Sequence, residues 1–336
     1  MTTASTDWKE VTTPDEEARY LRGAEFLREL QRKRDATGRG LHLKPNLGLT
    51  AELVINDNLP EPARHGLGAK PGRYPAYVRF SNGAGARQHD KKGDIRGLAI
   101  KVVGVEGKKV IPGMENARTQ DFLVINHPIT AVRNADEFLA IVRGLQTPAL
   151  LPIRLVASVG FGRAIKILSQ AAKDVGVKVP TLAANTYFTA APIKWGRYAV
   201  KVSFKSRVTV DPNSPRGSSA TYLADELTER VKAGPLTWDM QLQFYSDPES
   251  TPIELNDVVW KGDWINIGTL TLPQQDPTSE RGRKVSAFIE QASFDPWHAL
   301  VEHQPIGNMM RARNVAYRLS TQLRSAAKEP DGSETF

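Results

Sequence analysis

The hydrophobic pattern changes its period several times along the chain. Residues 13–37 carry apolar positions three or four apart, which predicts a helix, whereas the following stretch to about residue 126 holds short β-rich runs separated by Gly, Pro and Asn. Helical spacing returns over 134–177, strand-like alternation over 185–270, and a last helical pattern over 308–327. This order predicts an α+β domain built on an antiparallel sheet or barrel rather than on alternating βαβ units.

Local signals mark the ends of these regions. Thr13, Pro14 and Glu16 supply an N-cap hydroxyl, a proline at the first helical position and a glutamate three residues after the cap. Gly38 and Gly40 flank the expected end of that helix. We therefore expect an N-terminal helical arm over 1–38, a main domain over 39–327 with a helical insertion at about 134–177, and a polar tail over 328–336.

Composition and charge narrow the function classes. The 336 residues are 40% hydrophobic and 24% charged, which suits a globular chain with a sizeable core. Lys and Arg are scattered among acidic residues despite a net charge of +8, which favours a solvated surface over a nucleic-acid site. The absence of Cys excludes disulfides and thiolate chemistry. The sequence begins without a secretory signal, and its longest apolar run, 149–161, is interrupted by Arg154. We expect a cytoplasmic protein with no nucleic-acid partner and no firm membrane association.

The C-terminal helical pattern places three functional side chains on one face. Arg313 and Tyr317 are four residues apart, and Arg324 lies seven residues beyond Tyr317. A guanidinium beside a phenol favours the phenolate, which is a good ligand for ferric iron. Among the six histidines, none forms an HxxxH or HExxH pattern, and His42 stands out only through its neighbours.

Those neighbours belong to an ordered set of segments that resembles the catalase superfamily, and in particular its compact group of catalase-related haem peroxidases. The resemblance covers roughly residues 39–325 in the family's order. The segments are Arg39-Gly40-Leu41-His42, Tyr77-Val78-Arg79-Phe80-Ser81, Asp94-Ile95-Arg96-Gly97-Leu98-Ala99-Ile100-Lys101, Phe294-Asp295-Pro296, and Arg313-Asn314-Val315-Ala316-Tyr317 followed by Arg324.

The resemblance implies an antiparallel eight-stranded β-barrel core of catalase type with flanking helices, and haem b as the cofactor. It implies that Tyr317 is the iron ligand with Arg313 beside it. It further implies that His42 is the distal acid–base and that Ser81 is hydrogen-bonded to it. The propionates of the haem would be held by the remaining arginines of the motifs, Arg39, Arg79 and Arg324.

One position departs from the family pattern. Catalases carry a distal Asn, and counting back from the run Phe122-Leu123-Val124-Ile125 places Thr119 there. Asn116, three residues earlier, is the alternative if the preceding loop differs in length. We therefore expect Thr119 or Asn116 on the distal side.

The expected function is a haem-dependent peroxidase that reduces hydrogen peroxide or organic hydroperoxides with an electron donor, and the resemblance implies a homodimer. Three alternatives stay open from the sequence: a true catalase, a hydroperoxide isomerase or lyase, and a non-enzymatic haem or lipid carrier. The carrier is suggested by the apolar helices expected at 134–177.

Overall fold

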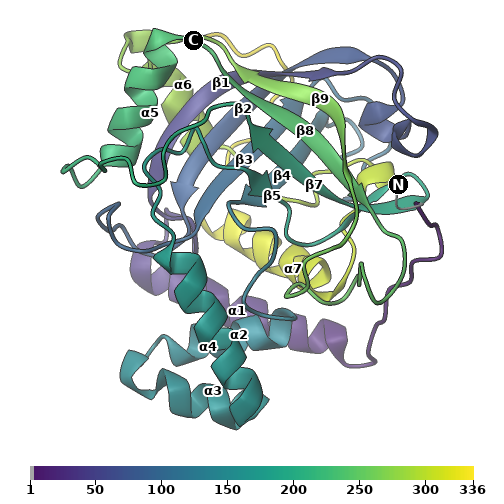
Figure 1. Ribbon diagram of the computed structural model, residues 1–336, viewed down its shortest axis with the longest axis vertical. Helices are drawn as coiled ribbons and strands as arrows, with labels where there is room; N and C mark the ends of the chain where they lie inside the picture. Colours follow the sequence, from purple (N-terminus) through teal and green to yellow (C-terminus); the bar gives the residue numbers. More distant parts are fainter. Residues whose placement is uncertain (1–3) are drawn as a thin grey trace.

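An antiparallel sheet of nine strands organises the computed structural model, which describes residues 4–336 (Figure 1). Eight strands close into a barrel in the order β1-β2-β3-β4-β5-β7-β8-β9, because β9 pairs back onto β1 and β5 pairs with both β4 and β7. The short β6 pairs with β7 beside β5. The strands are β1 Pro45–Ile55, β2 Gly72–Asn82, β3 Arg96–Val103, β4 Thr119–Ile125, β5 Tyr187–Phe188, β6 Ile193–Trp195, β7 Tyr198–Ser206, β8 Leu236–Phe244 and β9 Trp264–Leu272.

The barrel interior is a packed apolar core. Successive strand side chains point to opposite faces, so Val78 and Phe80 of β2 join the core while Arg79 and Ser81 lie on the outer face. Trp238 of β8 is fully buried in the same core. The closed antiparallel barrel with flanking helices confirms the fold class expected from the sequence.

Helices cover the outside of the barrel. α6 packs on β1 and β2, α7 packs against α1, and α2, α3 and α4 project together from one end of the molecule (Figure 1). None of the described helices combines the length and apolar composition needed to cross a bilayer. The helices are α1 Glu16–Asp35, α2 Ala135–Gly144, α3 Leu151–Val159, α4 Phe161–Gly176, α5 Tyr222–Ala233, α6 Glu280–Gln291 and α7 Asn308–Leu323, with 3-10 turns at Glu61–Ala63, Gly66–Gly68, Pro148–Leu150 and Val301–His303.

The boundaries differ from the sequence expectations in three places. α1 begins at Glu16, with Asp15 at the N-cap position but making no side-chain capping bond, while Thr13 lies in the preceding turn and its carbonyl accepts a hydrogen bond from the Glu16 amide. α5 lies inside the stretch expected to form only strands, and its Leu223, Leu227 and Val231 are buried at helical spacing. α6 was not expected at all. The division into arm, main domain and tail stays a prediction, and residues 1–3 of the arm lie outside the described residues.

Candidate active site

His42 follows α1 in a loop that the barrel holds in an unusual backbone conformation. Its φ angle is 53°, a left-handed value that costs a non-glycine residue energy and persists only where the surroundings enforce it. The His42 amide donates to the Gly83 carbonyl at 3.0 Å, and an Arg79 guanidinium nitrogen donates to the His42 carbonyl at 3.0 Å. The side chain is fixed as well, since His42 Nδ1 shares a hydrogen bond of 2.9 Å with Ser81 Oγ.

The strand beneath His42 leaves room for its ring. A Cβ atom at Gly97 of β3 would lie 2.5 Å from His42 Cε1, so a side chain at this position and the imidazole exclude one another. Burial, followed by the nearby charges of Arg79, Arg313 and Arg39, lowers the pKa of His42 to about 3. The imidazole is therefore neutral at physiological pH.

Three arginines converge at the C-terminal end of α6. Arg39 and Arg79 both bind the Glu290 carboxylate, at 2.7 Å each. Arg39 and Arg324 both donate to the Ala292 carbonyl, at 2.9 and 2.8 Å. The sequence placed these arginines on three distant segments, and the structure brings them together.

The cluster carries more positive than negative charge. Among the described residues, Glu290 ion-pairs with Arg39 and Arg79, and no carboxylate ion-pairs with Arg324; the Glu290 side chain is 37% exposed. Burial and repulsion from Arg79 lower the pKa of Arg39 to about 9, and burial also lowers the pKa of Arg324. A ligand with two negative charges would balance the cluster.

Tyr317 lies on α7 next to Arg313. An Arg313 guanidinium nitrogen donates to the Tyr317 hydroxyl at 3.0 Å, and the guanidinium carbon lies 5.1 Å from the ring centroid. Arg313 is also close enough to His42 to lower its pKa, and Tyr317 is close enough to Arg39 to affect its pKa. The phenol, the imidazole and the arginine cluster therefore belong to one neighbourhood between α7 and the outer face of the barrel.

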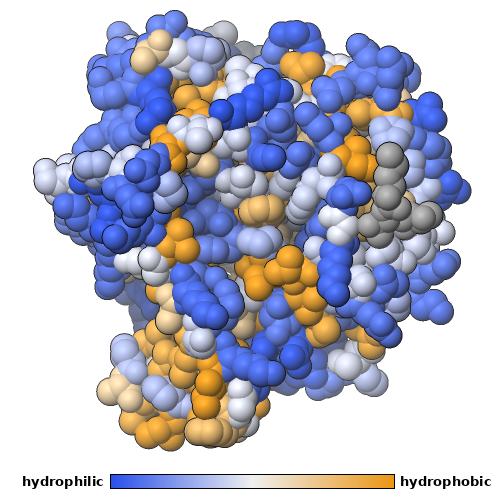
Figure 2. Space-filling view, in the orientation of Figure 1, coloured by the Kyte–Doolittle hydropathy of each residue, from blue (hydrophilic) through white to orange (hydrophobic). Residues whose placement is uncertain are grey.

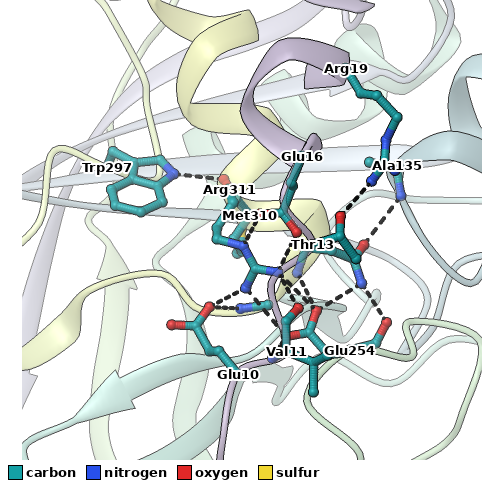
Figure 3. Close-up of polar contacts among 12 residues, drawn as sticks. Glu10, Val11, Thr13, Glu16, Arg19, Ala135, Glu254, Trp297, Met310 and Arg311 are labelled. Carbon is teal, nitrogen blue, oxygen red and sulfur yellow. Dashed lines mark hydrogen bonds and ion pairs between the residues drawn. The ribbon is translucent and has the colours of Figure 1, made fainter. Parts of the chain in front are cut away.

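α7 is held in place at its N-terminal half by contacts that the sequence motifs did not reveal (Figure 3). Arg311 forms ion pairs with Glu10 and Glu16 of the N-terminal stretch and with Glu254 of the loop between β8 and β9. Trp297 Nε1 donates to the Met310 carbonyl at 2.8 Å. These contacts tie α7 to the N-terminal segment and to the turn that contains Phe294-Asp295-Pro296.

The structure does not bring Thr119 or Asn116 to His42. In the β3–β4 register, Gly97 pairs with Ile125 at one end and Val103 pairs with Thr119 at the other, so Thr119 lies about 20 Å along the strand from the His42 end. The Thr119 hydroxyl donates to Glu329 at 2.6 Å instead. Asn116 is exposed in the loop before β4. The expected distal role of these two residues is not supported, because the register of β3 and β4 places the start of β4 at the end of the strand away from His42.

Sequence reasoning also missed Glu290, which joins Arg39 to Arg79. No motif marks it, and its helix, α6, was itself not expected. A signal was available in Val285 and Ile289, which are four apart and both buried against the barrel.

The arrangement fits a haem group. A phenol on α7 and an imidazole on the barrel are the donor types that flank a haem iron in proteins with tyrosine ligation. The arginine cluster has an excess of positive charge that the two propionates of a haem would compensate.

The chain is similar to known proteins in sequence and in fold. No family model matches the chain. The chain is 26% identical over 263 residues, 75% of its length, to a catalase-related peroxidase of Mycolicibacterium paratuberculosis, of which it covers 78%. Its fold is similar to those of a bacterial catalase (TM-score 0.64, 19% identity), a fungal catalase (0.66, 17%) and catalase A from Saccharomyces cerevisiae (0.65, 17%).

Each structural match covers 97% of this chain but only 63%, 66% and 67% of the respective catalase chain, so the protein spans about two thirds of their length. The shared part includes the whole barrel and its flanking helices. The comparisons thus show that the chain has a catalase-type fold and is similar in sequence to a catalase-related peroxidase.

Proposed function

We propose that the protein is a haem-dependent peroxidase that reduces hydrogen peroxide or organic hydroperoxides, with His42 as the distal acid–base and Tyr317 as the iron ligand. The observation that carries this proposal is the arginine cluster of Arg39, Arg79 and Arg324, whose excess charge calls for a dianionic ligand beside a phenol and an imidazole. The name of the relative from Mycolicibacterium paratuberculosis, a catalase-related peroxidase, supports the same activity.

Each side chain has a defined task in this proposal. Arg313 donates a hydrogen bond to the Tyr317 oxygen and so stabilises negative charge on it. Ser81 engages Nδ1 of His42, so proton exchange with a peroxide falls to Nε2. Arg79 has two tasks. It binds the His42 carbonyl, and together with Arg39 and Arg324 it forms the propionate clamp, the three arginines that would bind the haem propionates.

When bound, haem b supplies the redox-active iron at which the O–O bond of a peroxide is cleaved. The chain must then deliver and accept protons while a reducing co-substrate provides electrons. The low pKa of His42 keeps its imidazole neutral, so one ring nitrogen has a free lone pair to face a bound peroxide. The use of an electron donor and a homodimeric assembly stay predictions.

The decisive experiment examines the iron ligand. The purified protein is loaded with haem b, and its visible spectrum is compared with that of Tyr317→Phe. We expect the parent to show the charge-transfer features of a ferric phenolate and Tyr317→Phe to lose them or to lose the haem. Tyr74→Phe removes a phenol from β2 outside this neighbourhood and serves as the control. An unchanged spectrum in Tyr317→Phe contradicts the proposal.

A further inference from the structure

The helical end of the molecule exposes large apolar side chains. Figure 2 shows a hydrophobic surface over α3 and α4, on the part that projects away from the barrel. Ile153 and Phe161 are 68% and 71% exposed, far more than such side chains usually are in a folded protein. We define the apolar patch as Leu145, Leu150, Ile153, Val156, Phe161 and Ile165.

The apolar patch is separate from the apolar face that holds these helices together. Leu155 of α3 and Ala164 and Ile167 of α4 are buried in a cluster that includes Val132 and reaches Met309 of α7. Each helix therefore presents one apolar side to this cluster and a second one to solvent. A helix that only needed to pack on its neighbours would require the first side alone.

The same segment is positively charged. No acidic residue occurs over 145–173, while Arg154, Lys166 and Lys173 are exposed there, and within residues 4–336 none of the three forms an ion pair with a carboxylate. Arg163 differs, because it pairs with Glu137 and Asp257. Exposed apolar residues with interspersed cations and no anions are typical of helices that lie in the interface of an anionic membrane.

The hairpin formed by α3 and α4 has a shape that suits a membrane surface better than a second copy of the chain. Gly160, with φ of 80°, forms the turn between α3 and α4 and places Phe161 at its tip. A protruding ridge needs a preformed groove on a protein partner, whereas a fluid bilayer adapts to it. A two-fold dimer through the apolar patch would also bring identical cations towards one another.

We propose that the α3–α4 hairpin docks on the surface of an anionic lipid bilayer, with the apolar patch at the boundary of the acyl chains and Arg154, Lys166 and Lys173 among the headgroups. This attachment is peripheral and salt-sensitive. It goes beyond the sequence expectation of no firm membrane association, and it does not depend on the proposed peroxidase activity.

The test uses the full-length, haem-loaded protein and two kinds of vesicle, one of phosphatidylcholine alone and one of equal parts phosphatidylcholine and phosphatidylglycerol. We expect co-flotation with the anionic vesicles that weakens as salt is raised, and little with the neutral ones. Ile153→Ser/Phe161→Ser should reduce partitioning at least about tenfold, because two exposed side chains lose their transfer to the acyl boundary. Lys166→Gln/Lys173→Gln should reduce it on the anionic vesicles specifically.

Matched controls separate this effect from unfolding. Val259→Ser removes an apolar side chain that is 57% exposed elsewhere, and Lys70→Gln/Lys205→Gln removes two exposed cations, one from the loop before β2 and one from β7; both variants should bind like the parent. The lack of Cys also allows a single labelling site. A polarity-sensitive dye on Phe161→Cys should brighten with anionic vesicles, and the same dye on Val259→Cys should not.

Two results would overturn the proposal. One is equal partitioning of the parent and Ile153→Ser/Phe161→Ser on anionic vesicles, or no partitioning of the parent at all. The other is a mass in lipid-free light scattering that doubles with concentration and becomes monomeric in Phe161→Ser, which would assign the apolar patch to self-association.

Discussion

At the scale of single residues, the main feature of the candidate active site is a cluster of three positively charged side chains. Arg39, Arg79 and Arg324 approach one another although like charges repel, and the structure compensates them with Glu290 and with carbonyls at the end of α6. Arginine suits this task because its planar fork holds a carboxylate through paired hydrogen bonds and keeps its charge. The cluster thus keeps more positive charge than Glu290 balances.

Replacing the clamp residues one at a time should weaken haem binding. Arg39→Ala, Arg79→Ala and Arg324→Ala each remove charge-assisted hydrogen bonds worth about 1.5–3 kcal/mol, or roughly 10- to 150-fold in affinity. Lysine at the same sites should restore part of the loss. Haem titration followed by absorbance measures the effect, with Arg22→Ala, an exposed residue on α1, as the control. Parent-like affinity in all three variants would refute the clamp.

The distal role of His42 predicts a selective loss of activity. His42→Ala should retain haem but lose about 10²–10⁴ in the rate of peroxide reduction, the range for a positioned acid–base group. Gly97→Ala offers a second variant, because its Cβ would displace the imidazole while every ionisable group stays in the chain. Rates within a few-fold of the parent in both variants, measured at equal haem loading, would make His42 a structural residue.

At the scale of elements, the C-terminal tail closes the far end of the outer barrel face. Lys101 of β3 binds Asp121 of β4 at 2.8 Å and Glu329 of the tail at 2.6 Å, and His298 Nδ1 lies 3.0 Å from Glu329. Phe336 packs edge-on against Tyr77 and Phe288. The tail, expected from its polar composition to end the ordered part, is therefore held by buried ion pairs.

This cluster predicts a stability that falls at alkaline pH. Burial lowers the pKa of His298, but the adjacent carboxylates of Asp121 and Glu329 outweigh burial and raise the pKa to about 9. A histidine with a raised pKa stabilises the fold fully below its unfolded value of about 6.5, and this contribution is lost as pH rises through 9. The loss should reach about 3 kcal/mol. Urea unfolding across this range measures it.

His298→Asn supplies the comparison for that measurement. Its free energy of unfolding should be lower than that of the parent at neutral pH and should change less with pH between about 6.5 and 9. His89→Asn, which replaces an exposed histidine, should keep the slope of the parent. An equally steep slope in His298→Asn would mean that another group is responsible.

At the scale of the whole molecule, the sequence predicted what short-range patterns encode. The barrel strands and the Arg313/Tyr317 face follow from alternation and helical spacing, and the structure has both. The pairing of Arg39 with Glu290 and the anchoring of α7 by Arg311 join residues about 250 to 300 positions apart, and no local pattern reports such contacts. Thr119 was misplaced for a related reason, since the strand register decides which end of β4 lies near His42.

The last prediction concerns the balance between peroxidase activity and hydrogen peroxide dismutation. It rests on the groups that surround His42, on the distal side of the expected haem. Among the described residues, the hydrogen-bonding groups that contact His42 are Gly83, Ser81 and Arg79, none of which supplies a side-chain amide, and neither Thr119 nor Asn116 is near. Dismutation requires a second hydrogen peroxide to be oriented there, and a missing preorganised donor costs about 2.7–4 kcal/mol in a comparable case. Electron transfer from an organic reductant needs no such orientation.

We therefore expect the haem-loaded protein to oxidise a reducing dye faster than it releases oxygen, with hydrogen peroxide and with an organic hydroperoxide. Dye absorbance and an oxygen electrode follow the two reactions in one sample. Oxygen release should stay low even without the dye, because the orienting donor is then still missing. His42→Ala serves as the control, since it should depress dye oxidation and oxygen release together. Vigorous oxygen evolution with little dye oxidation would instead show that the distal face is complete and that the protein acts as a true catalase, with an orienting group brought in by movement of a segment around His42.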